Sequence, residues 1–172
     1  ISQTLPSEGL AMSRTVNLHH IEALIPLLNR SPYFQLLSMR MCALGKGFCR
    51  LEVDLERKHF NPFGSVHGGL CASLIDTAAY WAVYCDLEEE TGITTLDLNV
   101  DFVAPVLAGR LKTEGKRIRI GKTICLASAS VTDERDRLIA QGNSKIIVLP
   151  GRQILNDVVS FLESSPLPPK FL

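Results

Sequence analysis

Residues 70–84 form the stretch that most constrains the fold, because Asp76 is the only charged residue among them. The stretch follows a glycine pair, Gly68 and Gly69, and is rich in alanine, leucine and aromatic side chains. A helix with so few polar positions must be covered on most sides by other elements. We therefore expect a central, largely buried helix over about 68–87.

Asp76 is the one residue that does not suit such a helix. Asp76 lies two turns into the helix. A carboxylate caps a helix or interacts with its dipole only within the first turn, so neither role explains Asp76. Burying an unpaired carboxylate is costly. Asp76 is therefore expected to be paired, to be protonated or to face a polar functional pocket.

The start of the helix offers a second polar feature. The first N–H groups of a helix have no intrahelical partner and carry the positive end of its dipole, which suits a polarised carbonyl oxygen. Gly68 and Gly69 let a ligand approach that backbone closely, because they lack a Cβ. The alternative is that the glycine pair only permits a sharp bend from loop to helix.

Gly68 and Asp76 are separated by about 12 Å along the helix axis, at about 1.5 Å per residue. The two cannot act on one carbonyl carbon from the same chain. If both act on one substrate, the site must combine the helix start of one subunit with Asp76 of another, as in an isologous dimer.

Extended segments surround this helix in the sequence. Residues 47–57 alternate charged and apolar side chains, and together with 34–44 they predict a hairpin. Short helices are expected at 18–29, where Pro26 should bend or end the helix, and within 150–165. Four more extended segments follow the central helix, at about 93–104, 110–120, 123–133 and 138–149.

Length and charge exclude several function classes. The chain has 172 residues, enough for one domain, and 18 basic residues balance 18 acidic ones. The chain therefore has no overall positive charge that would favour binding to nucleic acid or to an anionic membrane. No apolar run reaches the length of a membrane span, and no signal peptide is evident. Five scattered cysteines indicate free thiols and a cytoplasmic protein, and no Cys/His spacing indicates zinc.

Three segments carry a family resemblance: the run from Asn61 to Asp76 with its His-Gly-Gly, then Asp97-Leu98-Asn99-Val100, then Leu138 to Gly142. Together they resemble the hotdog-fold acyl-CoA thioesterases of the PaaI-like, phenylacetate-pathway type. The resemblance implies an α+β hotdog domain over 33–149, a curved antiparallel sheet around the central helix. Residues 1–32 would then be a leader, loose over 1–14, with a short helix, and 150–172 a helix with a Pro-rich tail.

The resemblance also assigns roles to individual residues. The Gly68 N–H would polarise the thioester carbonyl, and Asp76 would be the general base or the attacking nucleophile. Asn61 would help to orient water or substrate, and closing a turn ahead of Pro62 is its alternative role. His67 would be a donor near the thioester, and structural packing or a loop cap is its alternative. Thr95 stands where relatives with an aspartate base carry a hydroxyl residue that holds the water, although a polar strand face also accommodates threonine.

A local basic strip is the candidate site for the phosphates of coenzyme A. We single out Lys122 at a turn, with Arg119, Arg137 and the Gly69 backbone as further contacts; the alternative is a solvated strand edge. The strip comprises Lys112, Lys116, Arg117, Arg119 and Lys122.

The expected reaction needs no cofactor besides the coenzyme A of the substrate. A homodimer would be the minimal active unit, and the resemblance suggests a homotetramer. A non-catalytic acyl-CoA sensor or carrier is the main rival, which the presence of Asp76 disfavours; a hotdog hydratase would need a different histidine context. Aryl-acetyl, medium-chain and hydroxybenzoyl thioesters all remain open as substrates, and Phe63, Tyr80, Trp81 and Phe102 are candidate pocket residues.

Overall fold

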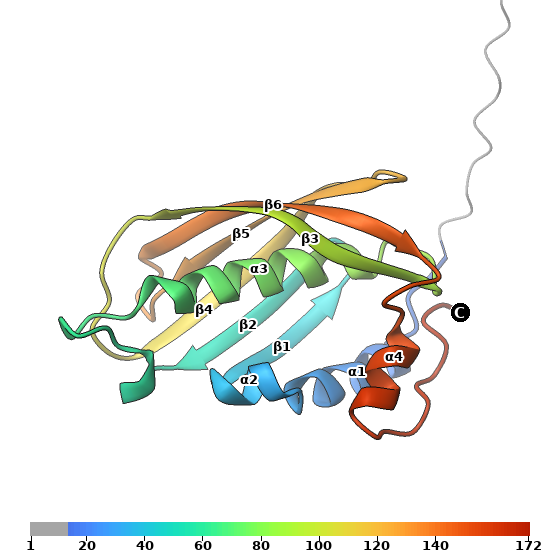
Figure 1. Ribbon diagram of the computed structural model, residues 1–172, viewed down its shortest axis with the longest axis horizontal. Coiled ribbons are helices and arrows are strands. Elements are labelled where there is room, and N and C mark those ends of the chain that lie inside the picture. The colour runs from blue at the N-terminus through green and yellow to red at the C-terminus, as the bar shows by residue number, and fades with distance from the viewer. Residues whose placement is uncertain (1–13) are drawn as a thin grey trace, which may run out of the picture.

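The computed structural model describes residues 14–172, and its centre is a six-stranded antiparallel sheet that curves around the long helix α3 (Figure 1). Residues 1–13, which make up nearly all of the expected loose leader, lie outside the described residues. The elements in chain order are α1 (Leu18–Asn29), α2 (Pro32–Leu36), β1 (Met39–Gly45), β2 (Phe48–Asp54), the 3₁₀ turn η1 (Arg57–His59), α3 (Gly68–Tyr84), β3 (Thr91–Phe102), β4 (Arg110–Arg119), β5 (Ile124–Thr132), β6 (Leu138–Pro150) and α4 (Leu155–Phe161).

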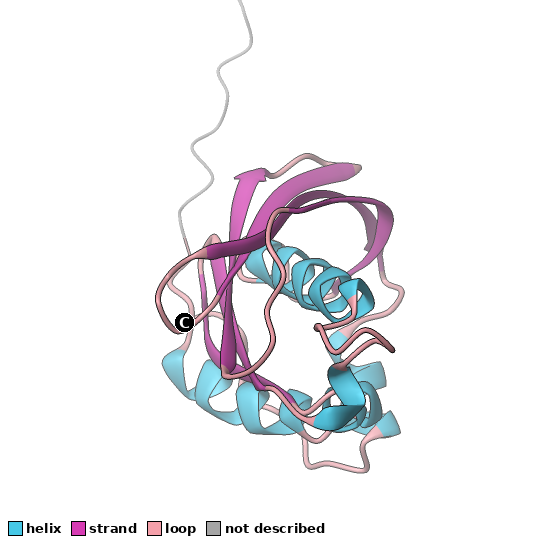
Figure 2. Cartoon of the chain, turned by 90° about the vertical axis from the view of Figure 1, so that its left-hand side faces the viewer, coloured by secondary structure: helices cyan, strands magenta, loops and turns pink. Residues whose placement is uncertain are grey.

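The strands lie in the order β1-β2-β4-β5-β6-β3, with every neighbouring pair antiparallel. Along β5, buried positions alternate with more exposed ones, as expected for a strand with one face toward a core. Figure 2 shows the sheet bending around α3. Two strands, a long helix and four strands is the predicted order, and the hotdog expectation is confirmed.

Helix α3 presents two different faces. The face against the sheet is fully buried and carries Leu74, Ile75, Ala78, Ala79, Ala82 and Val83. The opposite face is half-buried and carries Ser73, Asp76, Thr77, Tyr80 and Trp81. Gly115 of β4 permits the close packing of helix on sheet, because a Cβ there would lie 2.1 Å from the carbonyl oxygen of Ala78.

Some expected boundaries were wrong. The extended run expected over 34–44 begins as helix α2, because Pro32 at the first helical position favours a helix start. The central helix ends at Tyr84, three residues earlier than expected, ahead of the acidic stretch 86–90. Helix α1 continues through Pro26 to Asn29.

The chain's C-terminal residues are anchored to α1 and to the end of α3. Lys170 is fully buried, and its ammonium donates to the Leu87 carbonyl at 2.6 Å and lies 3.9 Å from the Tyr84 ring centroid. The Lys170 N–H donates to Glu89, and the Asn17 amide donates to the Pro169 carbonyl at 2.8 Å. The expected Pro-rich tail is thus a packed part of the domain.

Two expectations about the environment of the chain can be compared with the structure. All five cysteines are free thiols, with Cys42 exposed and the others buried. Within residues 14–172, no helix has both the length and the apolar character needed to cross a membrane.

Candidate active site

The first turn of α3 leaves one backbone donor free. The His67 side chain caps the helix, since its Nδ1 accepts from the Gly69 N–H at 2.9 Å, and the His67 carbonyl accepts from the Leu70 N–H at 3.0 Å. No hydrogen bond to the Gly68 N–H is found within residues 14–172. Gly68 therefore presents an unpaired donor at the positive end of the helix.

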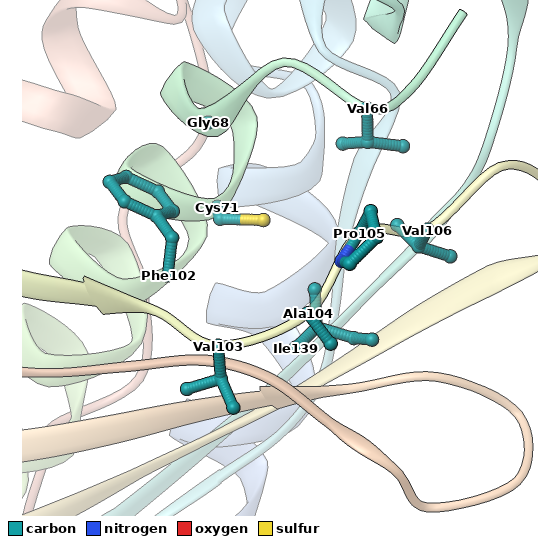
Figure 3. Close-up of a pocket in the computed structure, with 9 residues that line it drawn as sticks. All are labelled: Val66, Gly68, Cys71, Phe102, Val103, Ala104, Pro105, Val106 and Ile139. Carbon is teal, nitrogen blue, oxygen red and sulfur yellow. The ribbon is translucent and has the colours of Figure 1, made fainter.

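A cavity of about 300 Å³, here called the helix-start cavity, lies beside Gly68 (Figure 3). Its lining is mainly apolar and comprises Val66, Gly68, Cys71, Phe102, Val103, Ala104, Pro105, Val106 and Ile139. The Phe102 ring lies against the first turn of α3, because a Cβ on Gly68 would come within 2.9 Å of its Cε1. Only glycine leaves both the ring and the backbone N–H accessible there.

The second polar feature is a hydrogen-bonded pair between α3 and β3. The Thr95 hydroxyl donates to Oδ1 of Asp76 at 2.8 Å, and both side chains are partly buried. The register of β3 against β6 shifts between Thr95 and Asp97, so the strand is irregular at this point. The Asp76 carboxylate is thereby held by one donor, with its other oxygen on the half-buried face of α3.

Gly68 and Asp76 do not converge within one chain. They belong to one continuous helix and stand eight residues apart, about 12 Å along its axis. The structure brings Thr95 to Asp76, and it brings Phe102 to Gly68, but it leaves these two pairs separate.

Asn61 and His67 make local contacts. The Asn61 side-chain oxygen Oδ1 accepts from the N–H groups of Phe63 and Ser65, and its side-chain amide Nδ2 donates to the Ser65 hydroxyl at 2.8 Å. Asn61 thus closes the turn ahead of α3. His67 is exposed, and with Nδ1 accepting, the neutral ring carries its proton on Nε2, where it remains a donor.

The candidate cations lie at two ends of the sheet. Arg119 and Lys122 flank the β4–β5 turn, near the end of α3, whereas Arg137 precedes β6, near the start of α3 (Figure 1). Arg137 donates to Asp133 and to the Pro105 carbonyl, both at 3.0 Å. No partner of the Arg119 or Lys122 side chain is found among the described residues.

The rest of the basic strip is paired with acids. Lys112 contacts Asp136 at 2.7 Å, Lys116 contacts Glu114 at 3.4 Å, and Arg117 contacts Asp86. These pairs leave Arg119 and Lys122 as the members of the strip most able to bind an added phosphate.

A larger open cleft of about 730 Å³ adjoins the helix-start cavity, with which it shares Pro105 and Val106. Arg135 and Arg137 line this cleft. The sequence did not predict Cys71, residues 103–106 or Arg135 at this place. The signal for residues 103–106 was an apolar run with a proline directly after a strand.

Burial determines the ionisation of two groups near the site. It raises the pKa of the Cys71 thiol to about 11, so the thiol in the helix-start cavity is protonated at neutral pH and is a poor nucleophile. Burial, followed by the charge of Asp76, raises the pKa of Tyr80 to about 12. The Tyr80 hydroxyl donates to the Ile93 carbonyl at 3.0 Å.

Of the candidate pocket residues, Phe102 lines the helix-start cavity, whereas Phe63 is 94 % exposed. Tyr80 and Trp81 line a different cavity, toward α4. Residues 14–172 contain no group of three or more His, Cys, Asp or Glu side chains placed to hold a metal ion.

The chain matches the model of the thioesterase superfamily over residues 63–140. It is 28% identical over 144 residues to human "Acyl-coenzyme A thioesterase 13", covering 83% of this chain and 92% of the relative. A Listeria monocytogenes "1,4-dihydroxy-2-naphthoyl-CoA hydrolase" is 25% identical over 117 residues, or 68% of this chain and 95% of that one.

Solved structures give the same fold. A thioesterase from Haemophilus influenzae superposes with a TM-score of 0.71 at 23% identity, covering 77% of this chain and 92% of that chain. A putative esterase from Mycobacterium tuberculosis superposes with a TM-score of 0.67 at 25% identity, covering 71% of this chain and 99% of that chain.

Proposed function

This chain is a hotdog-fold member of the thioesterase superfamily, and we propose that it hydrolyses the thioester bond of an acyl-coenzyme A to release the free acid and coenzyme A. The observation that carries the proposal is the pair of polar features on α3: the unpaired Gly68 N–H and the Thr95-held Asp76 carboxylate. We further propose the PaaI-like type, on the His-Gly-Gly run and Asp76.

In the proposed reaction, the thioester oxygen accepts a hydrogen bond from the Gly68 N–H, where negative charge develops as the carbonyl carbon is attacked. Asp76 acts as a general base that takes a proton from the attacking water, or it attacks the acyl carbon itself and forms a mixed anhydride that water then hydrolyses to the free acid. The new bond is between oxygen and the acyl carbon, and the bond broken is between carbon and sulfur. The thiolate leaves and is protonated to the thiol of coenzyme A.

Thr95 is the positioning residue for Asp76. Its hydroxyl donates to Oδ1 at 2.8 Å and so fixes the carboxylate orientation, which leaves Oδ2 for water. His67 and Asn61 lie in the segment just before Gly68 and so belong to the helix-start part of the proposed site. His67 is a candidate donor there, while Asn61 supports the turn that precedes Gly68.

The proposed site is shared between subunits. The axial distance of about 12 Å prevents Gly68 and Asp76 of one chain from meeting at one carbonyl. An antiparallel pairing of two α3 helices about a two-fold axis would place Gly68 of each chain beside Asp76 of the other. We propose a homodimer as the active unit, assembled in pairs as a homotetramer, in the cytoplasm.

Coenzyme A would reach this site along the helix-start cavity and the adjoining cleft. The cavity is mainly apolar, which suits the pantetheine arm. The cleft is lined by Arg137 and Arg135, which suit phosphates, and also by Asp133, which Arg137 contacts, and Glu134. Lys122 and Arg119, at the far end of the sheet, would contact the nucleotide bound at the partner's helix start. The reaction as proposed uses water as its second reactant and no resident cofactor.

The direct test is Asp76→Asn, which keeps the shape of the side chain and its contact with Thr95 but removes the base or nucleophile. Thiol release from acyl-coenzyme A should fall by about 10²-fold to 10⁴-fold. Asp101→Asn is the matched control, because Asp101 is an exposed carboxylate on β3. Near-normal turnover of Asp76→Asn, or an equal loss in Asp101→Asn, would contradict the assignment; binding without hydrolysis by the wild type would favour a carrier.

A further inference from the structure

A second apolar cavity, here called the α4 cavity, lies on the half-buried side of α3. Its volume is about 440 Å³, within the range of small-molecule sites. Helices α1, α2, α3 and α4 all contribute to it, through Leu28, Phe34, Tyr80, Trp81, Val158 and Phe161. Figure 1 shows α4 beside α1, and both helices contribute residues to the cavity.

The α4 cavity begins one helical turn from Asp76. Tyr80 is four residues after Asp76, so the two side chains lie on the same face of α3, about 6 Å apart along the axis. The Asp76 charge contributes to the raised pKa of Tyr80, which reflects the same proximity. A group attached to a carbonyl carbon beside Asp76 would have to extend by only about 6 Å along α3, toward its C-terminus, to contact Tyr80 at the edge of this cavity.

The lining suits a hydrocarbon rather than a polar group. The Tyr80 hydroxyl is engaged by the Ile93 carbonyl, so the ring presents carbon to the cavity. Tyr80 and Trp81 pack edge to face, with ring centroids 5.4 Å apart, and form a rigid aromatic wall. The opposite wall, with Val158 and Phe161, comes from α4, which lies beyond the residues that match the family model.

The helix-start cavity and the α4 cavity differ in what lies beyond them. The helix-start cavity continues into the cleft with Arg135 and Arg137, which suits the phosphates of coenzyme A. The α4 cavity ends against α4. Its lining includes Asp157, whose carboxylate accepts from the Ile154 N–H at 3.0 Å, and no lysine or arginine. In a shared site, the substrate would thus extend from the helix start of one subunit, past Asp76 of the other, into the α4 cavity of that second subunit.

Resting on the proposed function, we propose that the α4 cavity binds the acyl group of the substrate as an unbranched hydrocarbon chain, and that α4 sets the length accepted. The cavity is open to solvent on one side, and its volume of about 440 Å³, compared with about 150 Å³ for a cavity that holds one benzene molecule, has room for a chain of roughly 12 to 16 carbons. Aryl-acetyl and hydroxybenzoyl groups would fill only part of it.

The kinetic test compares kcat/KM across a panel of acyl-coenzyme A substrates from butyryl to palmitoyl. For the wild type, kcat/KM should rise by up to about fourfold per added methylene until the cavity is filled. Val158→Trp fills part of the cavity and should lower the ratio of lauroyl to butyryl kcat/KM by at least about tenfold. Ser160→Trp places the same side chain on the exposed side of α4 and should leave this ratio unchanged.

A binding test stands independently of turnover. Trp81 is the only tryptophan of the chain, so its emission reports directly on the α4 cavity. Dodecanoate should shift or quench the emission of the wild type saturably, and butyrate should not at the same concentration. This inference would be overturned if the protein hydrolyses acyl-coenzyme A but dodecanoate leaves the emission unchanged, and if Val158→Trp and Ser160→Trp have the same ratio of lauroyl to butyryl kcat/KM. The proposed function would then remain intact. Saturable dodecanoate binding without hydrolysis would support the cavity and overturn the proposed function.

Discussion

Replacing Lys170 by methionine should remove one contribution to the pH dependence of stability above neutral pH. Lys170 is fully buried, and burial lowers the pKa of its ammonium from 10.5 to about 8. Between pH 8 and 10.5 the unfolded chain binds more protons at this lysine than the folded one, so the contribution of Lys170 to the free energy of unfolding should rise with pH across this window.

The magnitude follows from the same pKa. One pKa unit corresponds to about 1.4 kcal/mol. The lowered pKa of Lys170 therefore destabilises the folded state by about 3 kcal/mol at pH 7 and by less than about 1 kcal/mol at pH 10. Methionine keeps the length and the contact with the Tyr84 ring without the charge. It leaves the Leu87 carbonyl without its donor, which costs about 1–3 kcal/mol at every pH.

The assay is equilibrium unfolding in urea, followed by Trp81 emission, at pH 7 and at pH 10. The stability of the wild type relative to Lys170→Met should increase by about 2–3 kcal/mol from pH 7 to pH 10. Lys116→Met is the control, because Lys116 is an exposed lysine, and its relative stability should not change in this way. A relative stability of Lys170→Met that is the same at both pH values, or that changes in the opposite sense, would refute the reasoning.

Three further outcomes are expected. Thr95→Val removes the donor to Asp76 and should lower kcat by about 10-fold to 100-fold with a smaller effect on KM, as measured by thiol release; an unchanged kcat would exclude the positioning role. Gly115→Ala forces a Cβ toward the Ala78 carbonyl and should destabilise the fold by about 1–3 kcal/mol in urea unfolding, and an unchanged midpoint would contradict the tight packing. Lys122→Ala should raise KM for acyl-coenzyme A more than it lowers kcat and should spare a short thioester without the nucleotide; equal slowing of both substrates would remove Lys122 from the phosphate site.

The sequence predicted the order of elements and the position of α3 because both depend on local patterns. A nearly uncharged helix between alternating strands has few ways to fold other than inside a curved sheet. The free N–H at Gly68 follows from a helix start with a capping residue before it, and the structure has that cap in His67. The proximity of Thr95 to Asp76 came from the family resemblance, since strand register is not visible in one sequence.

Long-range contacts set the features that the sequence did not predict. Arg137 and Lys122 appear equivalent in sequence, but antiparallel pairing places their turns at opposite ends of the sheet. Residues 103–106 line a cavity only because the chain after β3 passes beside the start of α3. Lys170 is a charged residue in a Pro-rich end, and its burial depends on Leu87 and Tyr84, which are more than eighty residues away in the chain.

The central claim is that one thioester site combines Gly68 of one subunit with Asp76 of its partner. Complementation tests it most directly: Asp76→Asn and Gly68→Val are each purified inactive, then unfolded and refolded together. One of the two sites in each mixed dimer would then hold an intact Gly68 and an intact Asp76. Thiol release should return to about a quarter of the wild-type rate if subunits mix at random and the sites act independently. Mixed dimers that form and stay inactive, or a stable monomer with full activity, would contradict the shared site.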